Sequence, residues 1–139
     1  MANYTPSRKL SHAIRKTALY RSKFISQALE DLKRLPKNVR NSLRREFVQK
    51  IHVHPVECSE ALSPPLDSFR SLHYRDYRVV YQVFEDLKIV AVVGIGRKDR
   101  HHHGEIYKRL ELLARSGQLA AAVLDTYRSI SASDESPEE

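Results

Sequence analysis

The chain has 139 residues, which is the size of one domain with a modest hydrophobic core. Lys and Arg number 24 against 17 Asp and Glu, and the formal net charge of +7 favours nucleic acid or an acidic protein as a partner. The single cysteine, Cys58, excludes an internal disulfide and a multi-cysteine zinc site. Since the sequence also has no apolar run of about 18 residues and no apolar signal core, we expect a cytoplasmic protein without a membrane partner.

The two ends of the chain differ from its interior. Residues 1–18 are basic and lack a clean hydrophobic period, so they are interpreted as an N-terminal extension. Residues 131–139 are rich in acidic and small residues, which predicts a disordered acidic tail. The folded domain is therefore expected at residues 19–130.

A strand and two helices are predicted at the start of this domain. The strand is expected near residues 19–24. Apolar residues then recur at spacings of three and four up to Leu35, which predicts an amphipathic helix that Pro36 ends. A second helix follows, because its apolar residues lie four apart: Val39, Leu43, Phe47 and Ile51. The two helices make a hairpin.

From about Phe69 the pattern changes to that of strands. Residues 77–84 are rich in β-branched and aromatic side chains, and residues 89–95 are an apolar run typical of a strand buried on both faces. A helical period returns from Glu105 and is interrupted at Gly117. These elements predict an α+β fold in which an antiparallel sheet of three to four strands carries an N-terminal helical hairpin and a C-terminal helix on one side.

Four motifs, in order along the chain, carry a resemblance to a known family: Leu35-Pro36, Asp76–Val83, Val93–Asp99 and Glu105–Tyr107. With these motifs, residues 19–113 resemble the RelE/ParE toxins of type II toxin-antitoxin systems. The resemblance implies a microbial RNase-like RelE toxin fold, a cognate antitoxin, and contact with operator DNA only through the antitoxin complex. In the RelE branch it also implies cleavage of mRNA on the ribosome, without a metal ion or other cofactor.

Individual positions of that branch can be matched to this chain. A strand arginine matches Arg78, a basic residue after the last strand matches Lys98, and a tyrosine that opens the C-terminal helix matches Tyr107. RelE-type toxins often carry lysines on the preceding strand, whereas an ungapped match places Phe69 and Ser71 there. This departure favours a ParE-like toxin that binds DNA gyrase without cleaving RNA. A third alternative is a module that only binds its antitoxin and operator DNA.

Hairpin geometry predicts which side chains share a sheet face with Arg78. A two-residue turn at Arg75-Asp76 pairs His73 with Arg78. A second two-residue turn at residues 86–87 would place Arg97 on the same face, whereas a turn one residue longer or shorter would place Lys98 there. The pattern alone leaves both open.

RNA cleavage by its own 2′-hydroxyl needs a base, cations for the phosphorane charge and an acid for the leaving 5′-oxygen. We therefore expect a catalytic group that consists of Arg78, Lys98, Tyr107 and His73, although each is also compatible with a structural role. The basic residues expected to bind RNA are Arg97, Arg75, Arg100, Arg44 and Arg45. On the helical hairpin, such residues are equally compatible with an acidic antitoxin segment or a solvated surface.

Two further patterns are weighed against this site. The run His101–His103 is not expected to bind a metal, because three consecutive residues cannot all face one ion in a helix or strand. It is either an exposed loop or a source of the base or acid that the absent lysines leave open. Gly94-Ile95-Gly96 lacks the full spacing of a phosphate-binding loop and is not interpreted as one.

Overall fold

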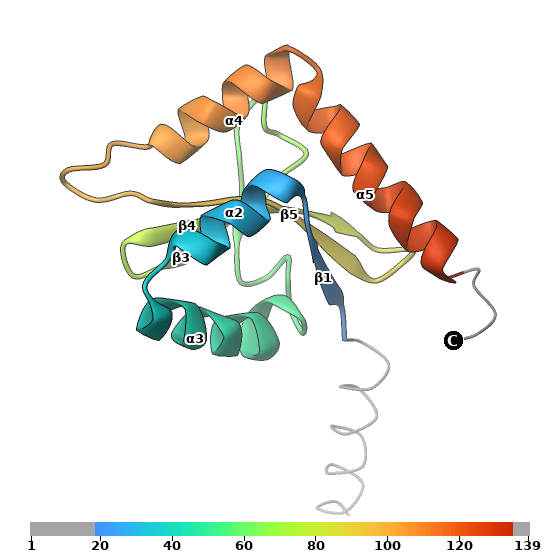
Figure 1. Cartoon of the computed structure of the whole chain (residues 1–139), viewed down its shortest axis with the longest axis horizontal. Coiled ribbons are helices and arrows are strands. Elements are labelled where there is room, and N and C mark those ends of the chain that lie inside the picture. The colour runs from blue at the N-terminus through green and yellow to red at the C-terminus, as the bar shows by residue number, and fades with distance from the viewer. Residues whose placement is uncertain (1–18, 135–139) are drawn as a thin grey trace, which may run out of the picture.

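The computed structural model describes residues 19–134, and the elements in this range are arranged as in Figure 1. In chain order they are β1 (Arg21–Phe24), α2 (Ser26–Arg34), α3 (Lys37–Glu46), the π-helical turn η1 (Phe47–Ile51), β2 (Glu60–Ala61), β3 (Arg70–Tyr74), β4 (Tyr77–Phe84), β5 (Ile89–Arg97), α4 (Glu105–Arg115) and α5 (Gln118–Asp134). None of the helices in this range is both long and apolar enough to cross a membrane.

The expected terminal segments lie largely beyond these limits. The basic extension at residues 1–18 is outside the described residues. Of the predicted acidic tail, residues 131–134 continue helix α5, and residues 135–139 are outside the described range.

The strands within residues 19–134 form one mixed sheet in the order β1-β5-β4-β3-β2. Strands β2 to β5 are antiparallel to their neighbours, as predicted, but β1 lies parallel to β5, with Arg21 opposite Ile89. The prediction of a purely antiparallel sheet with at most four strands was therefore wrong. Periodicity identifies a strand but does not reveal a pairing partner that lies more than 60 residues away in the sequence.

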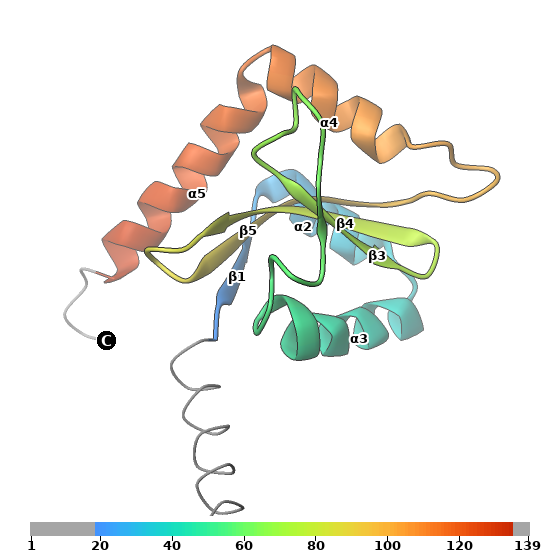
Figure 2. The same cartoon turned by 180° about the vertical axis from the view of Figure 1, so that it is seen from behind.

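Helices cover both faces of the sheet, which corrects the expectation that they pack on one side. Figures 1 and 2 place α3 below the sheet and α4 and α5 above it. On the lower side, Tyr74 of β3 contacts the Ser42 hydroxyl of α3. On the upper side, Phe84 of β4 packs against Tyr127 of α5 at 5.3 Å between ring centroids. Since β4 and β5 carry buried residues on both faces, each face needs a covering layer.

Two glycines in β5 allow α4 to approach the sheet closely. A Cβ atom at Gly96 would lie 2.7 Å from the Cβ of Ile106, and one at Gly94 would lie 2.7 Å from its Cδ1. The Cβ of Ile106 cannot move without its helix, so Gly96 allows α4 to sit at this height, whereas the Cδ1 atom near Gly94 is the flexible end of a side chain and could shift. The Gly-Ile-Gly motif thus serves helix packing.

A buried carboxylate joins α2 to β5 and α4. Asp31 accepts a hydrogen bond from the backbone N–H of Ile95 at 3.0 Å and from the Nη2 of Arg109 at 2.6 Å. The Ile95 N–H lies beyond the point where β1 stops pairing with β5, so Asp31 satisfies an otherwise open edge of that strand. This contact fixes α4 relative to the sheet.

Candidate active site

A β-bulge decides which of two consecutive basic residues joins Arg78. The β4–β5 turn has the expected register, with Phe84 opposite Ile89, but the register shifts between Val80 and Tyr81 because β5 contains one extra residue there, at Val93. Arg97 is consequently paired with Tyr77.

The same shift brings Lys98 into line with Asp76, whose carbonyl accepts a 2.7 Å hydrogen bond from the Lys98 N–H. Because opposite residues share a face, Lys98 and not Arg97 lies on the side of Arg78. The choice that the sequence left open is thus made by a bulge within the strands and not by the length of the turn.

Arg78, Lys98, Tyr107 and His73 all line one cleft of about 840 Å³. The cleft lies between the upper face of β3 and β4, the start of α4, and the loop that joins η1 to β2. His73 pairs directly with Arg78 across the hairpin, as predicted. The structure therefore brings together the four side chains that the sequence predicted to be catalytic.

Tyr107 is held in the first turn of α4 from two sides. Its hydroxyl lies 2.7 Å from the Ser71 Oγ on β3, and the Lys98 ammonium lies 5.7 Å from the centre of its ring. Gly104 precedes the helix with a φ of +86°, and a Cβ there would be 3.7 Å from the Tyr107 ring and 3.9 Å from the Lys98 side chain. A phenol and an ammonium are thereby fixed beside the positive end of a helix.

Of the three Lys and Arg residues that line the cleft, Lys50 pairs with Glu46 at 3.1 Å, whereas Arg78 and Lys98 have no acidic partner among the described residues. Within residues 19–134, no carboxylate forms an ion pair with Arg78 or Lys98. Arg78 donates instead to the carbonyl of Tyr77 at 3.1 Å, and at the 3.5 Å limit to that of Arg75. Asp76 and Asp99, the acidic residues near Arg78 in the sequence, do not pair with it. Its positive charge remains available to an anion.

Asp99 organises the loop that follows β5. Its carboxylate contacts Arg97 at 2.6 Å and the His102 Nδ1 at 3.0 Å, and it accepts the backbone N–H of His101 at 2.9 Å. The hydrogen bond from His102 is the main reason why the pKa of Asp99 lies far below its usual range. Arg97 and His102 are therefore occupied outside the cleft.

The histidine run does not complete the site. His101, His102 and His103 are absent from the residues that line the cleft. Within residues 19–134, no group of three or more His, Cys, Asp or Glu side chains is placed to hold a metal ion. The three histidines therefore contribute no side chain to the cleft.

The other expected RNA-binding arginines lie away from the cleft. Arg75 is in the β3–β4 turn with a φ of 53°, and its guanidinium lies over the Tyr74 ring at 5.1 Å. Arg44 and Arg45 are exposed on α3, on the opposite side of the sheet from α4. Arg100 is exposed in the loop after β5. The structure therefore separates these four from the predicted catalytic residues.

Several cleft residues were not identified from the sequence: Lys50, His54, Glu57, Glu60 and Glu111. Glu111 lies one helical turn after Tyr107, so the period of α4 contained a signal for it. Lys50 lies in η1, at the end of the predicted second helix, and the others come from β2 and the loop before it, which have no periodic pattern. That these residues line the same side of the cleft could not be inferred without the fold.

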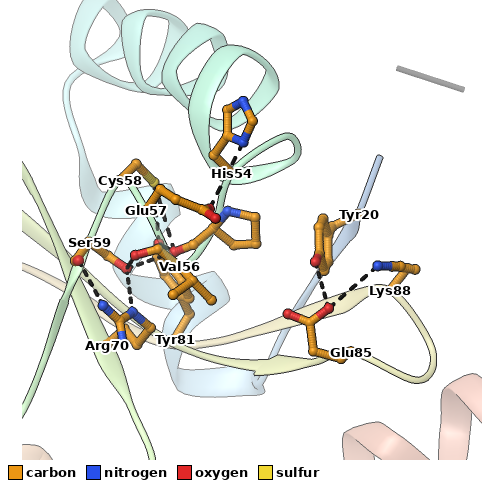
Figure 3. Close-up of polar contacts among 11 residues, drawn as sticks. Tyr20, His54, Val56, Glu57, Cys58, Ser59, Arg70, Tyr81, Glu85 and Lys88 are labelled. Atoms are coloured by element: carbon orange, nitrogen blue, oxygen red, sulfur yellow. Dashed lines mark hydrogen bonds and ion pairs between the residues drawn. The ribbon is translucent and has the colours of Figure 1, made fainter. Parts of the chain in front are cut away.

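The loop that carries His54 and Glu57 is fastened to the sheet (Figure 3). The buried Tyr81 hydroxyl donates to the Pro55 carbonyl at 2.6 Å, and burial is the main reason for its raised pKa. Arg70 binds both the Oγ and the carbonyl oxygen of Ser59, each at 2.8 Å. These contacts hold the outer wall of the cleft in place.

Neither position expected to hold a lysine supplies a cation. Ser71 is 8% exposed and contacts Tyr107, while Phe69 is 7% exposed. Phe69 lies in a second, more apolar groove beside Leu119 and Val123 of α5. The cationic wall of the cleft thus consists of Arg78 and Lys98 with the neighbouring His73.

Comparison with protein families gives one match over more than half of the chain. The family model described as "ParE toxin of type II toxin-antitoxin system, parDE" matches residues 23–102. The match includes β2 to β5 and ends in the histidine loop, so α4 and α5 lie beyond it.

Individual relatives agree with this match. The mRNA interferase toxin RelE of Escherichia coli (strain K12) is 28% identical over 89 residues, which are 63% of this chain and 93% of that relative. The crystal structure of the isolated E. coli RelE toxin is similar with a TM-score of 0.50 at 26% identity, over 66% of this chain and 98% of the other.

A toxin-antitoxin complex, RelBE2 from Mycobacterium tuberculosis, gives a TM-score of 0.56 at 18% identity, over 58% and 93% of the two chains. At this identity the likeness concerns the fold. Taken with the RelE structure, it confirms the predicted α+β fold of RelE toxins.

Proposed function

This chain belongs to the ParE toxin family of type II toxin-antitoxin systems, and from that premise we propose that it is a metal-independent endoribonuclease that cleaves mRNA on the ribosome and thereby stops translation. A cognate antitoxin neutralises it in the cytoplasm. Operator DNA is contacted only through the antitoxin complex.

The observation that carries this proposal is the convergence of Arg78, Lys98, Tyr107 and His73 on one cleft. The two unpaired cations suit a phosphate whose charge increases in the transition state. The Tyr107 ring suits stacking on a base, or its hydroxyl suits donation to a phosphate oxygen. Histidine is the side chain that most often serves as the base in acid–base catalysis, and His73 supplies one opposite Arg78.

The relatives support the same reading. The matched E. coli protein is named an mRNA interferase toxin, and the match spans 93% of it. The M. tuberculosis structure was solved as a toxin-antitoxin complex. The net charge of +7 also suits the crowded phosphates of a ribosome.

A second candidate function is a ParE-like toxin that binds DNA gyrase without cleaving RNA. It is favoured by the buried Ser71 and Phe69, which leave β3 without a cation on the cleft face. The absence of a cation there is compatible with this function, because a toxin of this kind needs no cluster of cations around a scissile phosphate.

Mapping RNA ends in cells after induction of the protein separates the two functions. We expect cuts at defined codon positions in translated messages, with 2′,3′-cyclic phosphate ends. Intact messages together with DNA-damage signalling would exclude the ribonuclease and support the gyrase-binding toxin.

The Arg78→Ala variant tests the site directly. We expect it to relieve growth arrest and to lower cleavage by about 100-fold or more, because an electrostatic contact to the transition state is lost. Antitoxin affinity should change little. Lys33→Ala, which removes an exposed 4.0 Å ion pair with Glu30, is the matched control and should remain fully toxic. Full toxicity of Arg78→Ala would contradict the site.

A further inference from the structure

The cleft contains two histidines that approach it from different elements. His73 comes from β3 and stands opposite Arg78. His54 comes from the loop after η1 and lines the same cleft. Transfer of a phosphodiester to a 2′-hydroxyl requires one group that takes a proton and one that gives a proton. Two imidazoles are well matched to that requirement.

His54 is held in position by its own loop. Its backbone N–H donates to the Lys50 carbonyl at 2.7 Å, and its carbonyl accepts the Cys58 N–H at 3.0 Å. The loop is in turn bound to the sheet through Pro55 and Ser59, which contact Tyr81 and Arg70 as described above (Figure 3). A side chain on this loop therefore starts from a fixed backbone.

A carboxylate lies next to His54 and distinguishes it from His73. The His54 Nδ1 is 3.9 Å from Glu57 Oε1, and Figure 3 shows the two side chains facing each other. Glu60 and Glu111 add acidic groups to the cleft, and Lys50 adds a basic one. Glu57 thus places a carboxylate beside the His54 ring, whereas His73 stands opposite the Arg78 guanidinium.

We propose that His54, oriented by Glu57, donates the proton to the leaving 5′-oxygen, whereas His73 accepts the proton of the attacking 2′-hydroxyl. This assignment rests on the proposed ribonuclease function and identifies the general acid of that reaction. It also explains how the cleft works without the lysines expected on β3, because the loop supplies the second proton-transfer group.

The proposed step balances without a co-reactant. The 2′-oxygen forms a bond to phosphorus as its proton passes to the neutral His73, and the bond from phosphorus to the 5′-oxygen breaks as that oxygen takes a proton from the protonated His54. The products are a 2′,3′-cyclic phosphate and a 5′-hydroxyl end. Arg78 and Lys98 hold the charge on the phosphoryl oxygens between these events.

A leaving group that needs no proton provides the test. The probe is a synthetic mRNA on programmed ribosomes, with the 5′-oxygen at a previously mapped cleavage site replaced by sulfur. A thiolate leaves without protonation, so loss of the acid matters only for the oxygen substrate. We expect His54→Gln to slow cleavage of the oxygen substrate by about 100-fold or more and to cleave the sulfur substrate at nearly the wild-type rate.

Two further variants complete the design. His73→Gln should slow both substrates, because its role is at the 2′-hydroxyl. Glu57→Gln should give a smaller loss than His54→Gln with the same rescue by sulfur, and it offers a second route to the answer if His54→Gln folds poorly. His102→Gln, whose ring is bound to Asp99 outside the cleft, should match the wild type.

The possible failures can be told apart. Wild-type rates for both His54→Gln and Glu57→Gln on the oxygen substrate would overturn the inference, as would an equal loss on oxygen and sulfur. In either case the ribonuclease function would stand if Arg78→Ala still abolished cleavage. Absence of any cleavage by the wild-type protein would overturn the proposed function together with this inference.

Discussion

The hydroxyl oxygens of Tyr107 and Ser71 lie 2.7 Å apart and join the first turn of α4 to strand β3. Ser71 is buried, and both residues line the cleft. A serine in place of the expected lysine removes a charge from the site but provides an anchor for the tyrosine.

This contact predicts coupled effects of two substitutions. Ser71→Ala should lower the rate of RNA cleavage by about tenfold at most, because one neutral hydrogen bond contributes about 1 kcal/mol. Tyr107→Phe should cost at least as much. Since both remove the same bond, the double variant should be less impaired than the product of the two effects predicts. Single-turnover rates of all four proteins measure the coupling, and strictly independent effects would contradict it.

The bulge in β5 predicts opposite outcomes for two adjacent residues. Lys98→Ala should reduce cleavage by about 100-fold, because its ammonium belongs to the cleft. Arg97→Ala should reduce it by less than about fivefold, because that side chain pairs with Asp99 at the exposed surface. Cleavage of a programmed mRNA measures both. A larger loss for Arg97→Ala would mean that the face assignment is reversed.

The close approach of α4 predicts a stability cost at Gly96. Gly96→Ala places a methyl group against Ile106, and overpacking of this kind lowers the free energy of unfolding by about 1–3 kcal/mol. Urea unfolding measures the change. Gly117→Ala is the informative comparison, since its Cβ would meet nothing within 4 Å and only the backbone φ of +82° is unfavourable, at about 1 kcal/mol.

Tyr107 belongs to α4 and lines the cleft, so a displacement of α4 by Gly96→Ala would also displace Tyr107. Cleavage by the folded variant therefore reports on the position of Tyr107. We expect reduced cleavage in that variant and unchanged cleavage in Gly117→Ala. Unimpaired stability of Gly96→Ala would show that α4 can move without cost.

His52 predicts a loss of stability in mild acid. It is half-buried, its Nε2 lies beside the Ser22 Oγ, and burial lowers the pKa of its ring. The unfolded chain takes up a proton at His52 below about pH 6.5, whereas the folded protein resists it. The unfolded state therefore binds more protons in that range, and the free energy of unfolding must fall as pH decreases from about 6.5 to the lowered pKa.

Urea unfolding at pH 7.5 and at intervals down to pH 5 measures this effect. In His52→Gln the part of the pH slope that belongs to this residue should vanish, and the free energy of unfolding above pH 7 should differ from the wild type only by a constant. An identical slope in the variant would assign the pH dependence to other groups.

The local features of the sheet, and the shared cleft of the four residues predicted to be catalytic, were accessible from the sequence. The β3–β4 register followed from a two-residue turn, and the pairing of His73 with Arg78 was confirmed. These features depend on alternation and turn length, which are properties of neighbouring residues.

Features that depend on distant segments were not accessible. The parallel pairing of β1 with β5 joins residues more than 60 positions apart. The burial of Asp31 on an otherwise amphipathic helix is explained by Ile95 and Arg109, which no helical period reveals. His54 and Glu57 reach the cleft because a loop without periodicity is bound to Arg70 and Tyr81. In each case the missing information is a tertiary contact.

The extra residue at Val93 has a consequence for comparing relatives of this protein. Two adjacent basic residues, Arg97 and Lys98, follow the strand, and a slip of one position exchanges the one that faces the cleft. A strand that gained or lost a bulge would still present a cation to the cleft, so the positive charge at this position is kept in either register. Equivalent residues in relatives should therefore be assigned by the sheet face on which their side chains lie and not by their position in an alignment.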